Sequence, residues 1–154
     1  MGDLRYGRTV HSLSNALLNF ETQLTFIGPP SLRLPEDLRD HLSREGRLGP
    51  EVTTLDEVED LDVLYVTRIQ RERFPDPLDY ERVRHAYRVT RDSIDRFGDD
   101  LKILHPLPRV NEVATDVDSH PGAMYFEQAQ NGVTVRMALL HLLMAEESRT
   151  EATS

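Results

Sequence analysis

The sequence predicts an α/β fold with a doubly wound, mainly parallel sheet and helices on both faces, a three-layer sandwich. Two observations favour this class. Short apolar runs alternate with helix-forming segments along the chain, which is typical of parallel strands joined by helices. A cluster of basic residues at 67–73 also directly follows the apolar run at 61–66, and loops at the carboxyl ends of such strands commonly bind ligands.

Four apolar runs predict the strands. One is expected over 23–27, where it stops at Gly28, and a second over 51–54. The runs at 61–66 and 101–104 predict buried central strands. Pro106 and Pro108 follow the last run and cannot continue a central ladder. They hold the backbone in a fixed extended or cis form, which leaves carbonyl groups available to a ligand.

Helices are predicted between the strands. The first begins near Arg8 and has apolar side chains at helical spacing, at Val10, Leu13, Leu17 and Phe20. Another opens at Pro35 and ends before Gly46, and a helical turn is expected at 55–60. Residues 80–97 form either one helix or two, because 87–90 is compatible with a strand or a break. Residues 110–118 read as helical and acidic.

The last predicted helix, over 125–147, is amphipathic. Val133, Met137, Leu140 and Met144 lie at helical spacing, and we interpret the two methionines as core filler. The domain is therefore expected to comprise residues 1–147, with a polar tail at 148–154.

Composition excludes several functional classes. The 154 residues carry a net charge of −9, which gives no electrostatic support for a nucleic-acid partner. The chain has no cysteine, so thiolate chemistry is excluded, and no apolar run is long enough to span a membrane. A cytoplasmic location is expected. Lysine occurs once, at Lys102; an acidic, lysine-poor composition fits a salt-rich cytoplasm, but GC-rich coding also favours arginine.

The basic cluster indicates a site for an anionic small molecule. Guanidinium groups match planar carboxylates because two parallel N–H donors meet two oxygens. Arg68 and Gln70 are the candidates, whereas Arg71 and Glu72 are interpreted as solvated. Arg8 is a third candidate, because an anion at a helix start also meets the helix dipole. These segments and the one around Pro106 are expected to converge on one edge of the sheet.

His105 and the acidic residues near His120 are interpreted as structural rather than as functional residues. A single histidine at a strand end, such as His105, is usually structural. Asp116, Asp118 and His120 lie close in sequence, but such spacing is a weak indicator of a metal site without matching geometry. We therefore predict neither a metal nor a cofactor.

Together these stretches resemble aspartate carbamoyltransferases. The resemblance is carried by Gly-Asp-Leu-Arg-Tyr-Gly-Arg-Thr-Val-His-Ser at 2–12, Thr-Arg-Ile-Gln-Arg-Glu-Arg-Phe at 67–74, and His-Pro-Leu-Pro-Arg-Val-Asn-Glu at 105–112. It continues through 114–118 and 125–129, and it covers nearly the whole chain. His-Pro-Leu-Pro favours the aspartate enzyme over its ornithine relative, in which the second position is typically cysteine.

The resemblance assigns roles to residues of the aspartate-binding half of that family. It implies that Arg8 holds the α-carboxylate of L-aspartate and that Arg68 and Gln70 bind the β-carboxylate side. Pro106 and Leu107 would offer backbone carbonyls to the reacting groups, with a cis bond between Leu107 and Pro108.

It also implies movement of the 68–79 loop on binding. Arg73 would pair with an acidic residue of the other half. Arg5 stands where the family usually has a lysine, and we group it with Arg73 as a residue of interdomain closure.

The carbamoyl-phosphate half of the family is not represented in the sequence. Its Ser-Thr-Arg-Thr phosphate motif, its loop lysine and its histidine on the carbamoyl oxygen are missing, and little of a strand precedes Gly2. A fragment, a split gene product and a mis-started reading frame all fit this pattern. The expected partners are a carbamoyl-phosphate-binding domain or chain, further copies in a homotrimer, and a regulatory chain. We assign no catalytic residue to this half; the alternative is a stand-alone domain that binds only a dicarboxylate or a partner.

Overall fold

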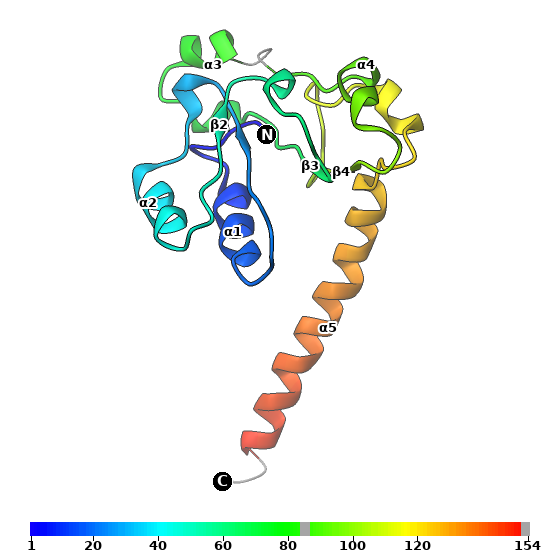
Figure 1. Cartoon of the computed structure of the whole chain (residues 1–154). Coiled ribbons are helices and arrows are strands. Elements are labelled where there is room, and N and C mark those ends of the chain that lie inside the picture. Colours follow the sequence, from blue (N-terminus) through cyan, green and yellow to red (C-terminus); the bar gives the residue numbers. More distant parts are fainter. Residues whose placement is uncertain (84–86, 152–154) are drawn as a thin grey trace.

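The computed structural model describes residues 1–83 and 87–151. Nine helices and strands follow one another within this part of the chain (Figure 1): α1 Arg8–Leu17, β1 Phe26–Ile27, α2 Glu36–Arg44, β2 Glu51–Val52, β3 Val63–Tyr65, α3 Pro77–Val83, α4 Arg91–Ile94, β4 Lys102–Leu104 and α5 Tyr125–Glu151. Short 3-10 helices lie between them, at Pro30–Leu32, Leu55–Glu57, Arg71–Arg73, Asp95–Phe97 and Thr115–Ser119. All four strands lie within the predicted runs, although each is shorter than predicted.

The strands pair in parallel, as predicted. β1 pairs with β2 through Phe26 and Glu51, and β3 pairs with β4 from Val63 opposite Lys102 to Tyr65 opposite Leu104. Beyond β4, the backbone of Ala123 bridges to Ile103 in parallel. The two ladders are short, so other backbone hydrogen bonds must connect them.

The first two residues connect the two strand pairs. The Met1 amino group donates to the Tyr65 carbonyl at 2.8 Å, and the Thr67 N–H donates to the Met1 carbonyl at 2.9 Å. On the other side, the Gly2 N–H donates to the Ile27 carbonyl at 2.9 Å. A Cβ at Gly2 would lie 2.3 Å from the Thr67 carbonyl oxygen, and its φ of 120° suits only glycine. Met1 and Gly2 thus lie between β1 and β3 as a strand would.

Core residues occupy both faces of this sheet. Successive strand residues point to opposite faces, and Phe26 and Ile27 accordingly belong to different buried clusters. The Phe26 cluster contains Val10 of α1 and the leucines of α2, Leu38 and Leu42, together with Leu4 and Leu34. The Ile27 cluster is larger and contains Val83 of α3, Ile94 of α4 and Tyr125 of α5. Helices therefore cover both faces, and the predicted three-layer α/β fold is confirmed.

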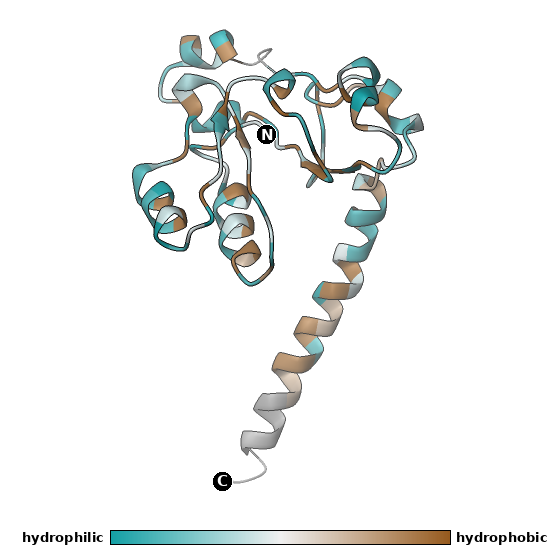
Figure 2. Ribbon diagram, viewed as in Figure 1, coloured by the Kyte–Doolittle hydropathy of each residue, from teal (hydrophilic) through white to brown (hydrophobic). Residues whose placement is uncertain are grey.

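The prediction for α5 is wrong in one respect. The helix extends away from the rest of the chain (Figure 1 and Figure 2), and apart from Tyr125 in its first turn its large apolar side chains do not pack into the core. Nine of them are 54–66% exposed: Phe126, Val133, Val135, Met137, Leu139, Leu140, Leu142, Leu143 and Met144. Their positions in the sequence place them on several sides of the helix rather than on one face, and because they are exposed the two methionines are not core filler within this chain. The helix also runs to Glu151, beyond the predicted end at 147.

The predicted helix over 110–118 is also wrong for its first half. Residues 110–114 are not helical, because their backbone groups have other partners. Val113 bridges in parallel to Val89, with the Val89 N–H donating to the Glu112 carbonyl at 2.8 Å. Only Thr115–Ser119 forms a helical turn. Of the stretch left open at 80–97, residues 84–86 lie outside the described residues, and α3 and α4 lie on either side of them.

Leu42 and Leu78 provide a matched test of this core. Leu42 of α2 is fully buried, whereas Leu78 of α3 is 64% exposed. Leu42→Ala is expected to lower the free energy of unfolding by about 2–5 kcal/mol, because it leaves a cavity. Leu78→Ala is expected to change it by no more than about 0.5 kcal/mol. Denaturant unfolding of the two variants checks this, and equal effects would contradict the packing described here.

Candidate functional site

Three chain segments meet around one pocket at the carboxyl ends of β3 and β4. The pocket has a volume of about 180 Å³. Its lining comes from the start of α1, the loop after β3 and the loop after β4: Gly7, Thr9, Thr67, Arg68, Gln70, His105, Pro106, Leu107 and Pro108. Four of the residues singled out in the sequence, Arg68, Gln70, Pro106 and Leu107, are thus brought together.

The other three basic candidates do not line this pocket. Arg8 is the first residue of α1, is exposed, and stands between the lining residues Gly7 and Thr9. Arg73 is half-buried, and its Nε donates to the Gln70 Oε1 at 3.0 Å. Arg5 is exposed, and its guanidinium lies 5.3 Å from the centre of the Tyr6 ring.

The loop after β3 holds its own polar side chains in place. The Arg68 Nη2 donates to the Glu72 Oε1 at 2.9 Å, one helical turn further along. Gln70 is fixed by the Arg73 contact, and the 3-10 helix Arg71–Arg73 creates both spacings. Arg68 therefore already binds one carboxylate, and its five N–H donors allow it to bind another.

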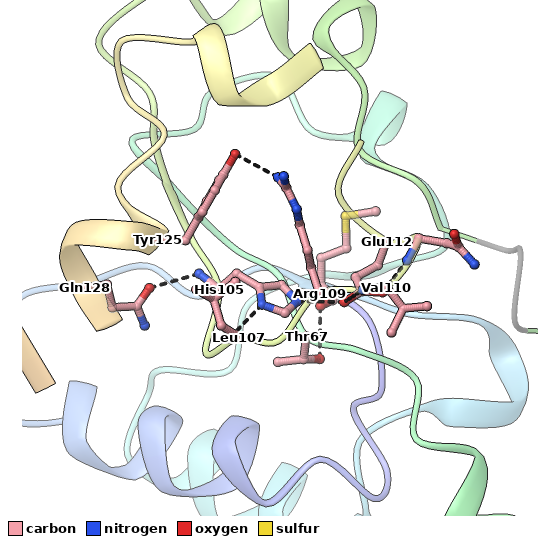
Figure 3. A network of polar contacts seen from close by, with 10 residues as sticks. Thr67, His105, Leu107, Arg109, Val110, Glu112, Tyr125 and Gln128 are labelled. Atoms are coloured by element: carbon pink, nitrogen blue, oxygen red, sulfur yellow. Dashed lines mark hydrogen bonds and ion pairs between the residues drawn. The ribbon is translucent and has the colours of Figure 1, made fainter. Parts of the chain in front are cut away.

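The loop after β4 has an unusual backbone. Leu107 has a φ of 52°, in the left-handed region that residues with a Cβ rarely adopt, and its bond to Pro108 is cis. The cis bond is the one that the resemblance implied. The Leu107 N–H donates to the Nδ1 of His105 at 2.9 Å, and the opposite ring nitrogen, Nε2, lies 2.9 Å from the Glu112 Oε1. The ring of His105 thus bridges the two ends of the loop (Figure 3).

The same loop is tied to the base of α5. The Gln128 Oε1 accepts the His105 backbone N–H at 2.9 Å (Figure 3). Arg109 donates from Nη2 to Asp118 at 2.6 Å and from Nη1 to the Tyr125 hydroxyl at 3.1 Å. The Tyr125 hydroxyl in turn donates to Asp118. These contacts hold the loop against the first turns of α5.

Electrostatics keep the carboxylates of this network ionised. Burial alone would raise the pKa of Glu112, but hydrogen bonds from His105 and from the N–H groups of Val110 and Asn111 hold it below its ordinary value of 4.5. The Arg109 guanidinium lowers the pKa of Asp118. Burial, followed by the neighbouring Asp118, raises the pKa of Tyr125 to about 12. At neutral pH the tyrosine is therefore a hydroxyl donor to an anion.

The acidic residues near His120 have other partners. Asp118 binds Arg109 and Tyr125, and the Asp116 Oδ2 accepts the Arg91 N–H at 3.3 Å. Within the described ranges, no group of three or more His, Asp or Glu side chains is placed to hold a metal ion. Over the same residues, no helix is both long and apolar enough to cross a membrane.

Sequence reasoning did not identify several residues around the pocket. Thr9 and Thr67 line it, and both are direct neighbours of predicted positions, which is the signal that could have found them. His105 was interpreted as structural, and its links to Glu112 and Leu107 have no signature in the sequence. The Gln128 contact spans 23 positions and depends on the path of the chain.

Residues 1–143 match the family model described as "Aspartate/ornithine carbamoyltransferase, Asp/Orn binding domain". The chain belongs to this family. It is 52% identical to the aspartate carbamoyltransferase catalytic subunit of Methanothermobacter thermautotrophicus, over 98% of this chain and 48% of the relative. The corresponding protein of Halorubrum lacusprofundi is 54% identical, over 94% and 46% respectively. The chain thus spans about half the length of the curated relatives it matches.

Solved structures of this family share the fold. The catalytic subunit of M. jannaschii aspartate transcarbamoylase has a TM-score of 0.85 and 48% identity, over 94% of this chain and 48% of that one. Aspartate transcarbamoylase from Trypanosoma cruzi, in complex with N-(phosphonacetyl)-L-aspartic acid, has a TM-score of 0.75 and 35% identity, over 90% and 44%. The likeness confirms the predicted resemblance to the aspartate-binding half of a transferase family.

The depressed pKa of Glu112 predicts a specific pH dependence of stability. A carboxyl whose pKa is lower in the folded state contributes stability above its unfolded pKa, and that contribution is lost as pH falls through the folded pKa. Glu112→Gln is therefore expected to lower the free energy of unfolding at pH 7 by about 1–3 kcal/mol. The difference from the unmodified chain is expected to shrink as pH falls below 4.5.

Urea unfolding between pH 7 and pH 3, at intervals of ~0.5 pH unit, measures this difference. Glu59→Gln is the control, since Glu59 is exposed and lies before β3, and its effect should be small at every pH. A deficit in Glu112→Gln that stays constant over the whole range would contradict an ionised, hydrogen-bonded Glu112.

Proposed function

We propose that this chain is the aspartate-binding half of an aspartate carbamoyltransferase. The observation that carries the proposal is the pocket, in which Arg68, Gln70, Pro106 and Leu107 lie together. The names of the similar proteins support aspartate rather than ornithine as the substrate. The neighbour from Trypanosoma cruzi in complex with an L-aspartic acid derivative supports the same choice.

The arginines would bind the two carboxylates of L-aspartate. Arg8 would hold the α-carboxylate at the start of α1, where the helix dipole also favours an anion. Arg68, with Gln70, would bind the β-carboxylate side. Because guanidinium groups from two separate segments would be needed, the site would select a dicarboxylate over a monocarboxylate.

The loop after β4 would orient the reacting groups. Backbone carbonyls of Pro106 and Leu107 would accept from the attacking amine and from the carbamoyl group. The amine would attack the carbonyl carbon of carbamoyl phosphate, and phosphate would leave, giving carbamoyl-aspartate for pyrimidine synthesis. This reaction needs positioning and charge stabilisation, and it needs no covalent intermediate or cofactor.

The partner would be the carbamoyl-phosphate half of the enzyme, and α5 supports this. A helix with apolar residues on several sides is normally buried, yet α5, which is hydrophobic along much of its length (Figure 2), projects from the chain with nine large apolar side chains exposed. The relatives carry about as much chain again as this one. The base of α5 also holds the loop after β4 through Gln128, which links this helix to the pocket.

Several further assignments belong to the same proposal. Residues 1–147 would act as one aspartate-binding domain, with 148–154 as a tail, and Arg5 and Arg73 would take part in closure onto the partner half. The assembled enzyme would be a cytoplasmic homotrimer, to which a regulatory chain could bind. The alternative is a stand-alone domain that binds a dicarboxylate or a partner without turnover, and the half-length match to the relatives favours it.

Combining the chain with the remaining half of the Halorubrum lacusprofundi relative tests the proposed reaction. The mixture is expected to form carbamoyl-aspartate from carbamoyl phosphate and aspartate, whereas this chain alone is expected to bind aspartate without turnover.

Arg68→Ala is expected to raise the aspartate KM about 10- to 100-fold, because it removes a charge-assisted hydrogen bond to the substrate. Arg71→Ala, in the same loop but exposed, is the control. Unchanged aspartate kinetics in Arg68→Ala would refute the assignment, and a mixture without turnover would favour the alternative.

A charge introduced on α5 tests the partner surface. Leu140→Glu is expected to weaken association of the two halves at least about tenfold, because it buries an unpaired carboxylate in the interface. Phe20→Glu also replaces a large exposed apolar side chain, 62% exposed, but lies after α1, and it should leave association unchanged. Sedimentation or size-exclusion titration of the two halves measures both. Equal affinities for the two variants would show that α5 is not the partner surface.

A further inference from the structure

Leu107 is held in a strained conformation beside the pocket. Its φ of 52° lies in a region that residues with a branched side chain seldom occupy, so neighbouring contacts must stabilise it. Leu107 lines the pocket together with Pro106 and Pro108. The groups that hold Leu107 therefore determine how this part of the backbone is presented to a ligand.

His105 supplies the contact. The Leu107 N–H donates to Nδ1 at 2.9 Å, so Nδ1 carries a lone pair and no proton. The ring proton is therefore on Nε2, which donates to the Glu112 Oε1 at 2.9 Å. Both ring nitrogens are occupied, and His105 is only 1% exposed. Because both ring nitrogens already have partners in the chain, we assign the ring the task of holding the Leu107 backbone rather than that of transferring a proton to or from a substrate.

Glu112 fixes the tautomer of His105. Its carboxylate accepts from His105 and also from the backbone N–H groups of Val110 and Asn111, at 3.1–3.2 Å. An ionised carboxylate has no proton to donate, so it can only accept a hydrogen bond from Nε2–H. The carbonyl of Glu112 is in turn held by the Val89 N–H, outside the loop, at 2.8 Å. The chain of contacts thus runs from a fixed backbone position through Glu112 and His105 to Leu107.

We propose that His105 and Glu112 are positioning residues for carbamoyl transfer: together they lock the Leu107 backbone into the strained form that the pocket requires. This proposal rests on the proposed function for its link to catalysis. Its structural part, the fixed tautomer and the Leu107 hydrogen bond, holds for the chain by itself. The two parts are therefore tested by separate measurements.

The first measurement uses the chain alone. The nitrogen NMR shifts of the His105 ring at neutral pH are expected to show a protonated Nε2 and an unprotonated Nδ1, with the Leu107 amide protected from hydrogen exchange. Glu112→Gln is expected to mix the two tautomers and to increase the exchange rate of the Leu107 amide at least about tenfold. The opposite tautomer, or an unprotected Leu107 amide in the unmodified chain, would overturn the proposal whatever the chain's function.

The second measurement uses the chain assembled with the remaining half of the relative. His105→Asn places an amide oxygen near the Nδ1 position and keeps the bond to Leu107. His105→Gln reaches the Nε2 position, where it can donate to Glu112, but leaves the Leu107 N–H without its acceptor. His105→Gln is expected to lower kcat about 10- to 100-fold, and His105→Asn less than about threefold, with the aspartate KM within about threefold in both. His41→Gln, on α2, is the control.

A purely structural role predicts a different pattern. In that case the variant with the lower melting temperature would lose more activity. Titration of active sites would then show fewer working sites, and this smaller number would account for the fall in kcat. Equal losses per titrated site in His105→Asn and His105→Gln would overturn the proposal. If the unmodified assembly has no turnover but the NMR signatures hold, the proposed function fails and with it the catalytic role, while the lock on Leu107 stands as a property of the fold.

Discussion

The parallel pairing of β3 with β4 is the constraint on which the site depends. Three residue pairs, from Val63 opposite Lys102 to Tyr65 opposite Leu104, make the two strands run in the same direction. Their carboxyl ends therefore leave the sheet side by side, although the loops that follow are separated by about a quarter of the chain. Without this pairing, the polar residues after β3 and the prolines after β4 would have no reason to share a pocket.

The two loops are stabilised in different ways. The loop after β3 is held mainly by contacts within itself, Arg68 with Glu72 and Gln70 with Arg73, and these groups are partly exposed. Exposed ion pairs contribute little stability, so the contact between Arg68 and Glu72 can be exchanged for another at a small cost in free energy. The loop after β4 is held by the buried ring of His105. The loop after β3, which we propose binds an anion, is thus held by more exposed contacts than the loop after β4.

The positions of most helices and strands were predictable from the sequence, but the contacts that their side chains make were less so. Alternating apolar runs gave the parallel α/β fold, and Arg68 and Pro106 were found because ligand loops follow strands. The error at 110–114 arose because propensity cannot detect that the Glu112 carboxylate accepts the backbone N–H groups of Val110 and Asn111, or that Val113 bridges to Val89. The error at Met137 and Met144 arose because an apolar residue at helical spacing looks the same whether its partner is in the chain or outside it.

The sequence by itself determined the family, the fold class and the residue types of the site, because these depend on local patterns and on motifs that are contiguous in the chain. Only the tertiary structure decided which side chains meet. It placed Met1 and Gly2 between β1 and β3, assigned Asp118 to Arg109, and joined His105 to Glu112 and Leu107. Such contacts depend on distances and directions in space, and residue order does not specify these until the strands have paired.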